Sequence, residues 1–486
     1  AADSTIDDNA SLSVGTLDLA DFALTLDDNM SRLSIAQSLT LDATGEKIVT
    51  GAADLSLNGG ISATSGTLSS TGGIVSASNL SAGAAGIINF QGGTLSLPGG
   101  ATLANGASFS TSNTTLNLGG SLAVAGTWSG SNTTSISLTT DNASLSSTVA
   151  LSLASLQTNG HDFELASATT DLTIKNAFAL SGGETLSTQG ADLIFKKSAD
   201  ISSGSTLDAS GGGKLEFQLG GTDNGTINAR NATFKIGSAY AVTGILKTNS
   251  STTWDLASNL DLSGGTLELG GTVVLDKVLT DNLTSFKLGE DATVTRNQGF
   301  NLGGLDLDNS TFTLGSATTD LTIDFSDSFA YADANNSCEQ MGMSTPSTEE
   351  QCFGAKGSSL LWNGYDLTTT RHPNLAQCTS ATTNAVNWPA CRQSGRTVYW
   401  NNCANKNPQP SSTRNQICIN HTYSGSPSGT LATVLADLTI VGEIAELTAG
   451  TTISSTDGTL TFGEGLSVNG GTVNLLNSTL AVGETF

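Results

Sequence analysis

The stretch NSTFTLGSATTDLTI, residues 309–323, contains two units that recur along the chain. Its first half, N-x-T followed by alternating apolar residues, returns at residues 113–119, 231–237 and 477–483. Its second half, LGSATTDLTI, matches LASATTDLTI at 165–174, and the tail returns as ADLTI at 436–440. Because side chains alternate across a strand, each unit predicts a short strand with one apolar face. The Asn and Gly residues supply the turns between strands.

A third unit places Gly-x-Thr before alternating apolar residues. It occurs as SGTLSS (65–70), GGTLSL (92–97), GGTLEL (264–269), GGTVVL (270–275), DGTLTF (457–462) and GGTVNL (470–475). Gly pairs begin at 72 and 92, and again at 99 and 119, which are steps of 20 residues. That period fits one coil of a parallel β-solenoid, although an antiparallel meander has the same spacing. Small aliphatic side chains stack well when coils repeat every roughly 4.8 Å, so we expect an all-β parallel β-solenoid.

Composition agrees with many short strands and excludes several classes of partner. Of the 486 residues, 37% are hydrophobic but only 5% are aromatic, and 56 are Gly. The formal net charge of −25 argues against binding to nucleic acid, which requires clustered cations. No apolar run is long enough to cross a bilayer, so we expect no membrane insertion.

Residues 331–428 interrupt the repeats. They contain all six Cys, six of the seven Pro and three of the five Trp. Asp320 and Asp437 occupy matching positions 117 residues apart, and removing the 98 residues of the interruption leaves 19, about one coil. We therefore predict a β-solenoid over residues 1–330, an inserted Cys-rich small domain over 331–428, and a continuation of the solenoid over 429–486.

The cysteines predict disulfides. They are Cys338, Cys352, Cys378, Cys391, Cys403 and Cys418. An even number in a short, Pro-rich segment is typical of a disulfide-stapled domain in an oxidising compartment, and the pairing is left open. The alternative is a metal site, but no C-x-x-C pair occurs and the nearby His residues are His372 and His421. We expect no cofactor or metal. Acidic residues such as Asp27 and Asp28 could bind Ca²⁺, but the sequence contains neither an EF-hand loop nor the calcium-binding nonapeptide repeat.

Aromatic and Arg side chains gather in the same interruption. The candidate ligand-binding residues are Trp362, Tyr365, Arg371, Trp388, Arg392, Arg396 and Trp400. Exposed aromatics beside Arg are typical of a surface that binds a glycan or a protein receptor. The alternative is that these aromatics form the core of the small domain.

No catalytic residue is expected, and the protein is not predicted to be an enzyme. Asp306 and Asp308 are a carboxylate pair of the kind that glycosidases use, but the repeats around them favour a solvated outer face. His161 is expected to have a surface or capping role. No G-x-S-x-G, H-E-x-x-H or phosphate-binding loop occurs.

The G-G-T and N-x-T units resemble those of bacterial secreted β-helix proteins, namely autotransporter passengers and filamentous-haemagglutinin-like adhesins. The resemblance covers most of residues 1–330 and 429–486. It implies export, a right-handed parallel β-helix, and an adhesive or surface-layer role at the cell surface. The first residues, Ala1-Ala2-Asp3, are typical of a mature end left after signal cleavage.

Three functions are considered. Residues 12–26 and 473–482 have ordinary strand sequences near the two ends, which predicts a subunit of an extracellular filament or sheath that assembles head to tail with itself. Residues 30–37 are expected to form a short cap. The first alternative is an adhesin passenger that binds through the Cys-rich insert. The second is a carbohydrate-cleaving tailspike.

Overall fold

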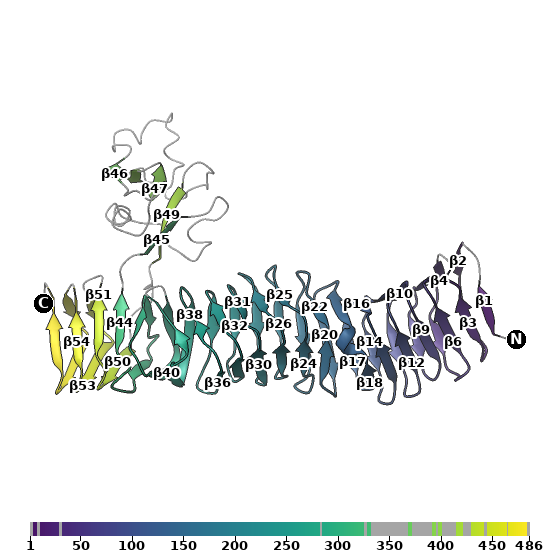
Figure 1. Cartoon of the computed structure of the whole chain (residues 1–486), viewed down its shortest axis with the longest axis horizontal. Helices are drawn as coiled ribbons and strands as arrows, with labels where there is room; N and C mark the ends of the chain where they lie inside the picture. The colour runs from purple at the N-terminus through teal and green to yellow at the C-terminus, as the bar shows by residue number, and fades with distance from the viewer. Residues whose placement is uncertain are drawn as a thin grey trace. The chain divides into compact units, whose positions relative to one another are not determined.

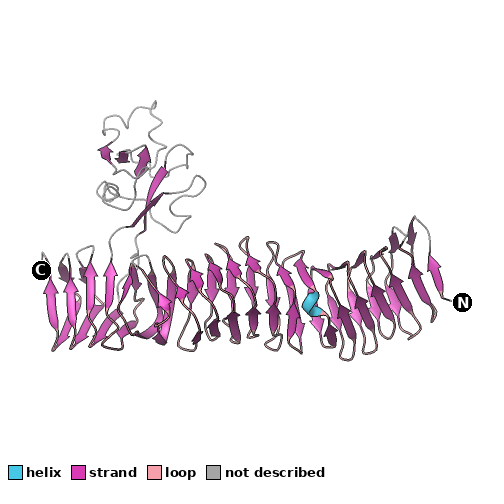
Figure 2. Ribbon diagram, viewed as in Figure 1, coloured by secondary structure: helices cyan, strands magenta, loops and turns pink. Residues whose placement is uncertain are grey.

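The computed structural model is a parallel β-solenoid of about 17 turns, and strand is nearly its only regular structure (Figure 2). It describes residues 3–6, 10–28, 32–281, 284–324, 328–331, 368–371, 391–394, 397–400, 415–420, 429–441, 445–463 and 465–483. One 3₁₀ helix, η1 (Ser131–Thr133), is the single helical element in these ranges. The chain divides into two compact units, residues 1–279 with 289–293, and residues 280–288 with 294–486.

Three parallel sheets build the first part of the first unit. Sheet I contains β1 (Ser4–Ile6), β3 (Ala23–Leu26), β6 (Lys47–Thr50), β9 (Thr67–Ser70), β12 (Ile87–Phe90), β15 (Ser108–Thr111) and β18 (Thr127–Ser129). Sheet II contains β2 (Ser11–Val14), β4 (Arg32–Ile35), β7 (Asp54–Leu57), β10 (Ile74–Ala77), β13 (Thr94–Leu97), β16 (Thr115–Leu118), β19 (Ser135–Leu138) and β22 (Ser155–Gln157). Sheet III begins with β5 (Leu39–Leu41), β8 (Ile61–Ala63), β11 (Leu80–Ala82), β14 (Ala101–Leu103), β17 (Ser121–Val124) and β20 (Ala143–Ser147).

Sheet III continues while two further sheets form the later coils of this unit. Its later strands are β23 (Phe163–Leu165), β26 (Thr185–Ser187), β29 (Thr206–Asp208), β32 (Thr226–Asn228), β35 (Ile245–Lys247) and β38 (Thr266–Val274). Sheet IV contains β21 (Leu151–Leu153), β24 (Leu172–Ile174), β27 (Leu193–Phe195), β30 (Lys214–Phe217), β33 (Thr233–Ile236) and β36 (Thr253–Leu256). Sheet V contains β25 (Phe178–Leu180), β28 (Ala199–Ile201), β31 (Gly221–Asp223), β34 (Tyr240–Val242), β37 (Leu260–Asp261) and β39 (Val278–Leu279).

Neighbouring strands within sheets I to V are parallel and one coil apart in sequence. The step ranges from 18 residues, between Leu260 and Val278, to 24, between Ala23 and Lys47. The 20-residue step of the Gly pairs is the step between β10 and β13, where Val75 pairs with Leu95. In Figure 1, β6, β9 and β12 lie side by side in this way. The parallel solenoid is confirmed, and the antiparallel meander is excluded for these strands.

Alternate residues of each strand point into the coil and form apolar columns. One column, which runs through sheet II in register, is Leu33, Leu55, Val75, Leu95, Leu116 and Ile136, each at most 1% exposed. The outward residues between them include Ser34, Ser56 and Ser76. Each coil therefore buries its aliphatic residues against the coil before and the coil after, which small side chains allow.

The Asn of the N-x-T unit forms the corner of a coil. Asn113, Asn231, Asn309 and Asn477 have φ values of 53°, 62°, 64° and 56°. This left-handed backbone is accessible to Asn because its short polar side chain bonds locally. Each of these residues lies two positions before a strand, for example Asn113 before β16. The predicted turn chemistry is thus confirmed at all four corners.

The S-A-T-T-D unit makes the same hydrogen bonds in both of its full copies. In the first, the buried Thr170 Oγ1 accepts from the backbone N–H of Ser147 at 3.0 Å, and Thr169 Oγ1 donates to the Ser147 carbonyl at 3.0 Å. In the second, Thr319 and Thr318 make the corresponding bonds to Arg296 at 2.9 and 2.8 Å. The same residues therefore recur in both copies because they make the same hydrogen bonds between a corner and the preceding coil.

The second unit contains three columns of parallel strands. The first follows β40 (Ser285–Thr295) and contains β42 (Gly304–Asp306), β43 (Thr311–Leu314), β50 (Gly429–Val434), β53 (Thr451–Thr456) and β56 (Thr472–Leu476). The second contains β41 (Phe300–Leu302), β44 (Leu321–Asp324), β51 (Leu438–Val441), β54 (Thr459–Phe462) and β57 (Thr479–Val482). The third contains β52 (Ala445–Thr448) and β55 (Leu466–Asn469).

The solenoid passes over the interruption without a change of register. β44 pairs directly with β51, so that Leu321 lies opposite Leu438, 117 residues later. Between them lie β45 (Ser328–Tyr331), β46 (Thr368–Arg371), β47 (Cys391–Ser394), β48 (Thr397–Trp400) and β49 (Asn415–Asn420). β45 and β49 are antiparallel, which brings together the entry and exit of the interruption. The domain boundaries at 331 and 428 stay a prediction, because most of that segment lies outside the described residues.

The prediction of a short cap at residues 30–37 is wrong. Arg32–Ile35 forms strand β4 and pairs with both β2 and β7. Leu33 and Ile35 alternate with Arg32 and Ser34, and this period of two favours a strand over a capping turn.

Candidate functional site

The structure describes the backbone of three of the seven candidate ligand-binding residues. Arg371 ends β46, Arg392 lies in β47 and Trp400 ends β48. In register, Trp400 pairs with Arg371 on one side and with Cys391 on the other. The register thus brings the backbones of Arg371 and Trp400 together across neighbouring strands. Trp362, Tyr365, Trp388 and Arg396 lie outside the described residues.

The disulfide prediction also falls largely outside the described part of the chain. Cys391 begins β47 and Cys418 lies in β49, while Cys338, Cys352, Cys378 and Cys403 are not described. The disulfides therefore stay a prediction.

The carboxylates and the histidine that the sequence singled out in the solenoid have local partners. Asp306 lies 3.8 Å from Lys287 Nζ, and its Oδ1 accepts from the backbone N–H of Asp308 at 3.2 Å. His161 Nδ1 lies 3.0 Å from Asp141 Oδ1, one coil earlier. These contacts support the interpretation of Asp306 as part of an outer turn, and they give His161 a partner that the sequence did not indicate.

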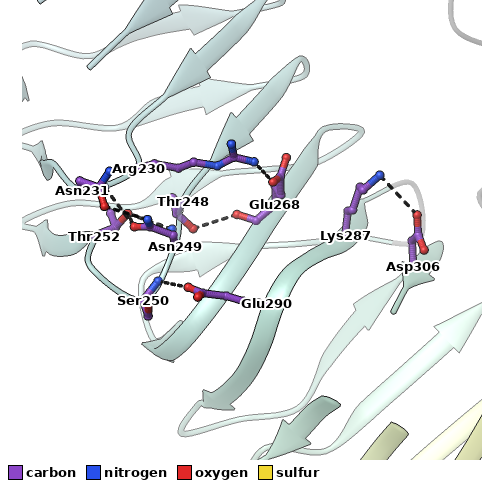
Figure 3. Close-up of polar contacts among 10 residues, drawn as sticks. All are labelled: Arg230, Asn231, Thr248, Asn249, Ser250, Thr252, Glu268, Lys287, Glu290 and Asp306. Atoms are coloured by element: carbon purple, nitrogen blue, oxygen red, sulfur yellow. Dashed lines mark hydrogen bonds and ion pairs between the residues drawn. The ribbon is translucent and has the colours of Figure 1, made fainter. Parts of the chain in front are cut away.

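The polar contacts around Asn249 link four successive coils, those of Asn231, Asn249, Glu268 and Glu290 (Figure 3). Asn249 Nδ2 donates to Asn231 Oδ1 at 2.9 Å, and Asn249 Oδ1 accepts from the Asn231 backbone at 3.0 Å. Glu290 accepts from the backbone N–H of Ser250, and Arg230 forms an ion pair with Glu268. The side chains of Glu290 and Arg230 each reach across an intervening coil. Arg230 therefore has a charged partner within the solenoid, and the Glu290 carboxylate has a backbone donor.

A second polar feature is a row of alternating charges on the outer side of sheet IV. Glu216, Lys235 and Asp255 are consecutive partners in register. Lys235 Nζ lies 3.1 Å from Asp255, and Lys214 Nζ lies 3.2 Å from Glu216 and 3.7 Å from Asp192. We call Asp192, Lys214, Glu216, Lys235 and Asp255 the charge ladder. Alternation avoids stacking like charges at the spacing of one coil.

The charge ladder shifts the pKa values of Glu216 and Lys235. Burial acts to raise the pKa of Glu216, but hydrogen bonds from Gln218 and Lys214 and the charges of Lys214 and Lys235 outweigh it and lower the pKa. The hydrogen bond to Asp255, and then the charges of Asp255 and Glu216, raise the pKa of Lys235. Both shifts favour the charged forms of Glu216 and Lys235.

The sequence interpretation missed Asp223, whose carboxyl lies inside the coil. It is 0% exposed, and burial raises its pKa to about 7 although the backbone N–H of Gly225 acts against the shift. Its column in sheet V reads Ile201, Asp223 and Val242. Aligning the coils by their corners would have shown an acid at an aliphatic position.

The clearest contacts of the described side chains hold coils to one another. Among the described residues, no group of three His, Cys, Asp or Glu side chains could hold a metal ion. The charge ladder and the contacts around Asn249 pair donors with acceptors, and cations with anions, on coils that are one or two apart. This arrangement best supports a structural role, in which polar contacts link the coils along the solenoid.

Comparison with protein-family models, curated proteins and solved structures gave no match for this chain. Within the part of the chain that the structure describes, no helix has the length and apolar character to span a bilayer.

Proposed function

We propose that the protein is a structural subunit of an extracellular filament or sheath, and that copies stack end to end through their outermost coils. The observation that carries the proposal is that apolar side chains in those coils are exposed at inward-facing positions, whereas their partners in the adjoining coil are buried. The predicted disulfides and the resemblance to secreted β-helix proteins support an extracellular location.

The last described coil leaves apolar positions uncovered. Leu475 belongs to a column whose earlier members, Thr433 and Ser455, are 2% and 1% exposed, whereas Leu475 is 41% exposed. Val468 is 48% exposed, whereas Leu447, its partner in the coil before, is 5% exposed. Burial of apolar area contributes about 25 cal/mol per Å², so a further coil on this surface would be stabilising.

The first described coil has the corresponding feature. Leu12 is 42% exposed, while Leu33, its partner in the next coil, is 1% exposed. β2 pairs with β4 on one side, so its other backbone edge is free for a parallel strand among the described residues. Strand addition to such an edge combines backbone hydrogen bonds with burial of alternate side chains. A head-to-tail contact would therefore continue the stacking seen within the chain.

The test uses two variants that each block one end. Leu12→Asp places a charge on the first coil, and Leu475→Asp places one on the last; both side chains are exposed, so the fold should be retained. Negative-stain electron microscopy of the wild-type protein should show fibres that lengthen with concentration, and each variant alone should remain monomeric.

An equimolar mixture of the two variants should form dimers and no fibres, because one intact first coil then meets one intact last coil. Leu219→Asp, at a side chain that is 55% exposed and away from both end coils, is the matched control and should form fibres. Wild-type monomers at every concentration, or fibres from both end variants, would contradict the proposal.

A further inference from the structure

The corner after β31 is short, and Asp223 closes it. Two residues lie between Asp223 and Thr226, the first residue of β32, whereas four lie between Ile201 and Thr206 in the coil before. Asp223 Oδ1 accepts from the backbone N–H of Gly225 at 2.9 Å. The Asp223 carbonyl accepts from Thr243 and Gly244 in the next coil, at 2.7 and 2.9 Å. This residue therefore joins the corner of its own coil to the corner of the next.

The second carboxyl oxygen lies in an apolar environment. Asp223 Oδ2 is buried and has no hydrogen-bond partner among the described residues. Above and below it in register are Ile201 and Val242, which are 1% and 0% exposed. The inward residues of the surrounding strands are also apolar, namely Leu207, Leu215, Phe217, Ile227, Phe234 and Ile236. An ionised carboxylate in this place has no cation or second donor to compensate its lost hydration.

Few titratable groups face this carboxyl. On β34 the titratable residue is Tyr240, which is 1% exposed. Burial raises its pKa most, and the negative charges of Asp223 and Asp200 raise it further. On β28 the titratable residue is Asp200, which is exposed on the outer face, where its carboxylate accepts from the backbone N–H of Thr222 at 2.9 Å. Both groups add negative charge or none, so neither stabilises an ionised Asp223.

We propose that Asp223 makes the coils from Ala199 to Val242 a pH-sensitive segment of the solenoid, closed while the carboxyl is protonated and loosened once the proton leaves. The burial that raises its pKa to about 7 supports this. In the unfolded chain the carboxyl ionises near 3.8, so the segment loses stability as pH rises from about 4 to 7. Through this residue alone, the opening equilibrium should shift on the order of a thousandfold over that range.

Hydrogen exchange between pH 4 and pH 8 tests the proposal on the full chain. After correction for intrinsic rates, amides of β28, β31 and β34 should lose protection as pH rises in the wild-type protein. Asp223→Asn keeps the acceptor for Gly225 and removes the titration, so its protection there should be independent of pH. Asp200→Asn, an exposed acid beside the same strands, should behave as the wild type. An equal loss of protection in Asp223→Asn and wild type would overturn the proposal.

A second measurement needs no folded variant. Infrared spectroscopy of the wild-type protein at pH 6 should show the carbonyl stretch of a protonated carboxylic acid, and this band should disappear with a midpoint near neutral pH. If every carboxyl of the wild-type protein is ionised at pH 6, the proposal fails.

Discussion

Asp320 accepts a hydrogen bond from the backbone N–H of Asp437 at 2.9 Å, across 117 residues of chain. Asp171 makes the same 2.9 Å bond to Asp192 across 21 residues. Asp437 repeats it to Thr459 at 2.7 Å. The aspartate of the D-L-T-I unit thus links each coil to the next in the same way, whether or not a long segment intervenes.

Removal of residues 331–428 should leave the solenoid intact. The strands on either side, β44 and β51, are already neighbours in register, and the shortened connection has the length of one coil. We expect unchanged far-ultraviolet circular dichroism and a melting temperature within a few degrees of the full chain. A deletion that extends through Leu321–Asp324 removes β44 as well and should destabilise the protein strongly.

Thr170→Val and Thr319→Val should each destabilise the chain by about 1–3 kcal/mol, because each leaves a buried backbone N–H without its acceptor. The N–H groups concerned belong to Ser147 and Arg296. Thr173→Val, on the half-buried outward face of β24, is the matched control and should change stability by less than about 0.5 kcal/mol. Denaturant unfolding measures all three; equal losses at Thr170 and Thr173 would contradict the assigned role.

Tyr240 should tolerate loss of its hydroxyl better than its neighbour Gly221 tolerates a methyl group. The hydroxyl donates to the Ala199 carbonyl at 3.2 Å, so Tyr240→Phe should cost about 0.5–1.5 kcal/mol. A Cβ on Gly221 would lie 2.0 Å from the same carbonyl oxygen at a φ of +146°, so Gly221→Ala should cost more. Gly15→Ala meets no atom within 4 Å and should be neutral in the same thermal unfolding assay.

Acid should weaken the charge ladder through Glu216. Its pKa is lowered in the folded protein, so its contribution is present above the pKa of the unfolded chain and is lost as pH falls through the folded value. Stability measured from pH 6 down to pH 2 should therefore fall less steeply in Glu216→Gln than in the wild type. An unchanged slope would show that Glu216 gains nothing from Lys214 and Lys235.

The six cysteines should be inaccessible to alkylation until the protein is reduced. Mass spectrometry of the denatured, unreduced chain treated with iodoacetamide should show no adduct, and reduction should allow six. Adducts without reduction would indicate free thiols and would remove one support for an extracellular location.

The parallel coils and their corners could be predicted because the sequence repeats them. The Asn of the N-x-T unit and the alternation of Leu with Ser determine the turn and the strand locally. Spacing also placed Leu321 beside Leu438, since only a whole coil returns the chain to the same face. The polar links could not be predicted, because Glu290 and Ser250 lie two coils apart and nothing local indicates that they meet. Asp223, by contrast, could have been found, because an alignment of the coils by their corners places it between Ile201 and Val242.

The bond from Tyr240 to Ala199 also has a mechanical consequence. Coils bonded only to their nearest neighbours should peel away one at a time when the stack is pulled along its length. The Tyr240 side chain passes the coil of Gly221 and holds the coil beyond it, so three coils must yield together. Under load, these three coils should separate as one unit, and the Arg230–Glu268 and Ser250–Glu290 contacts should extend the same resistance to the coils that follow.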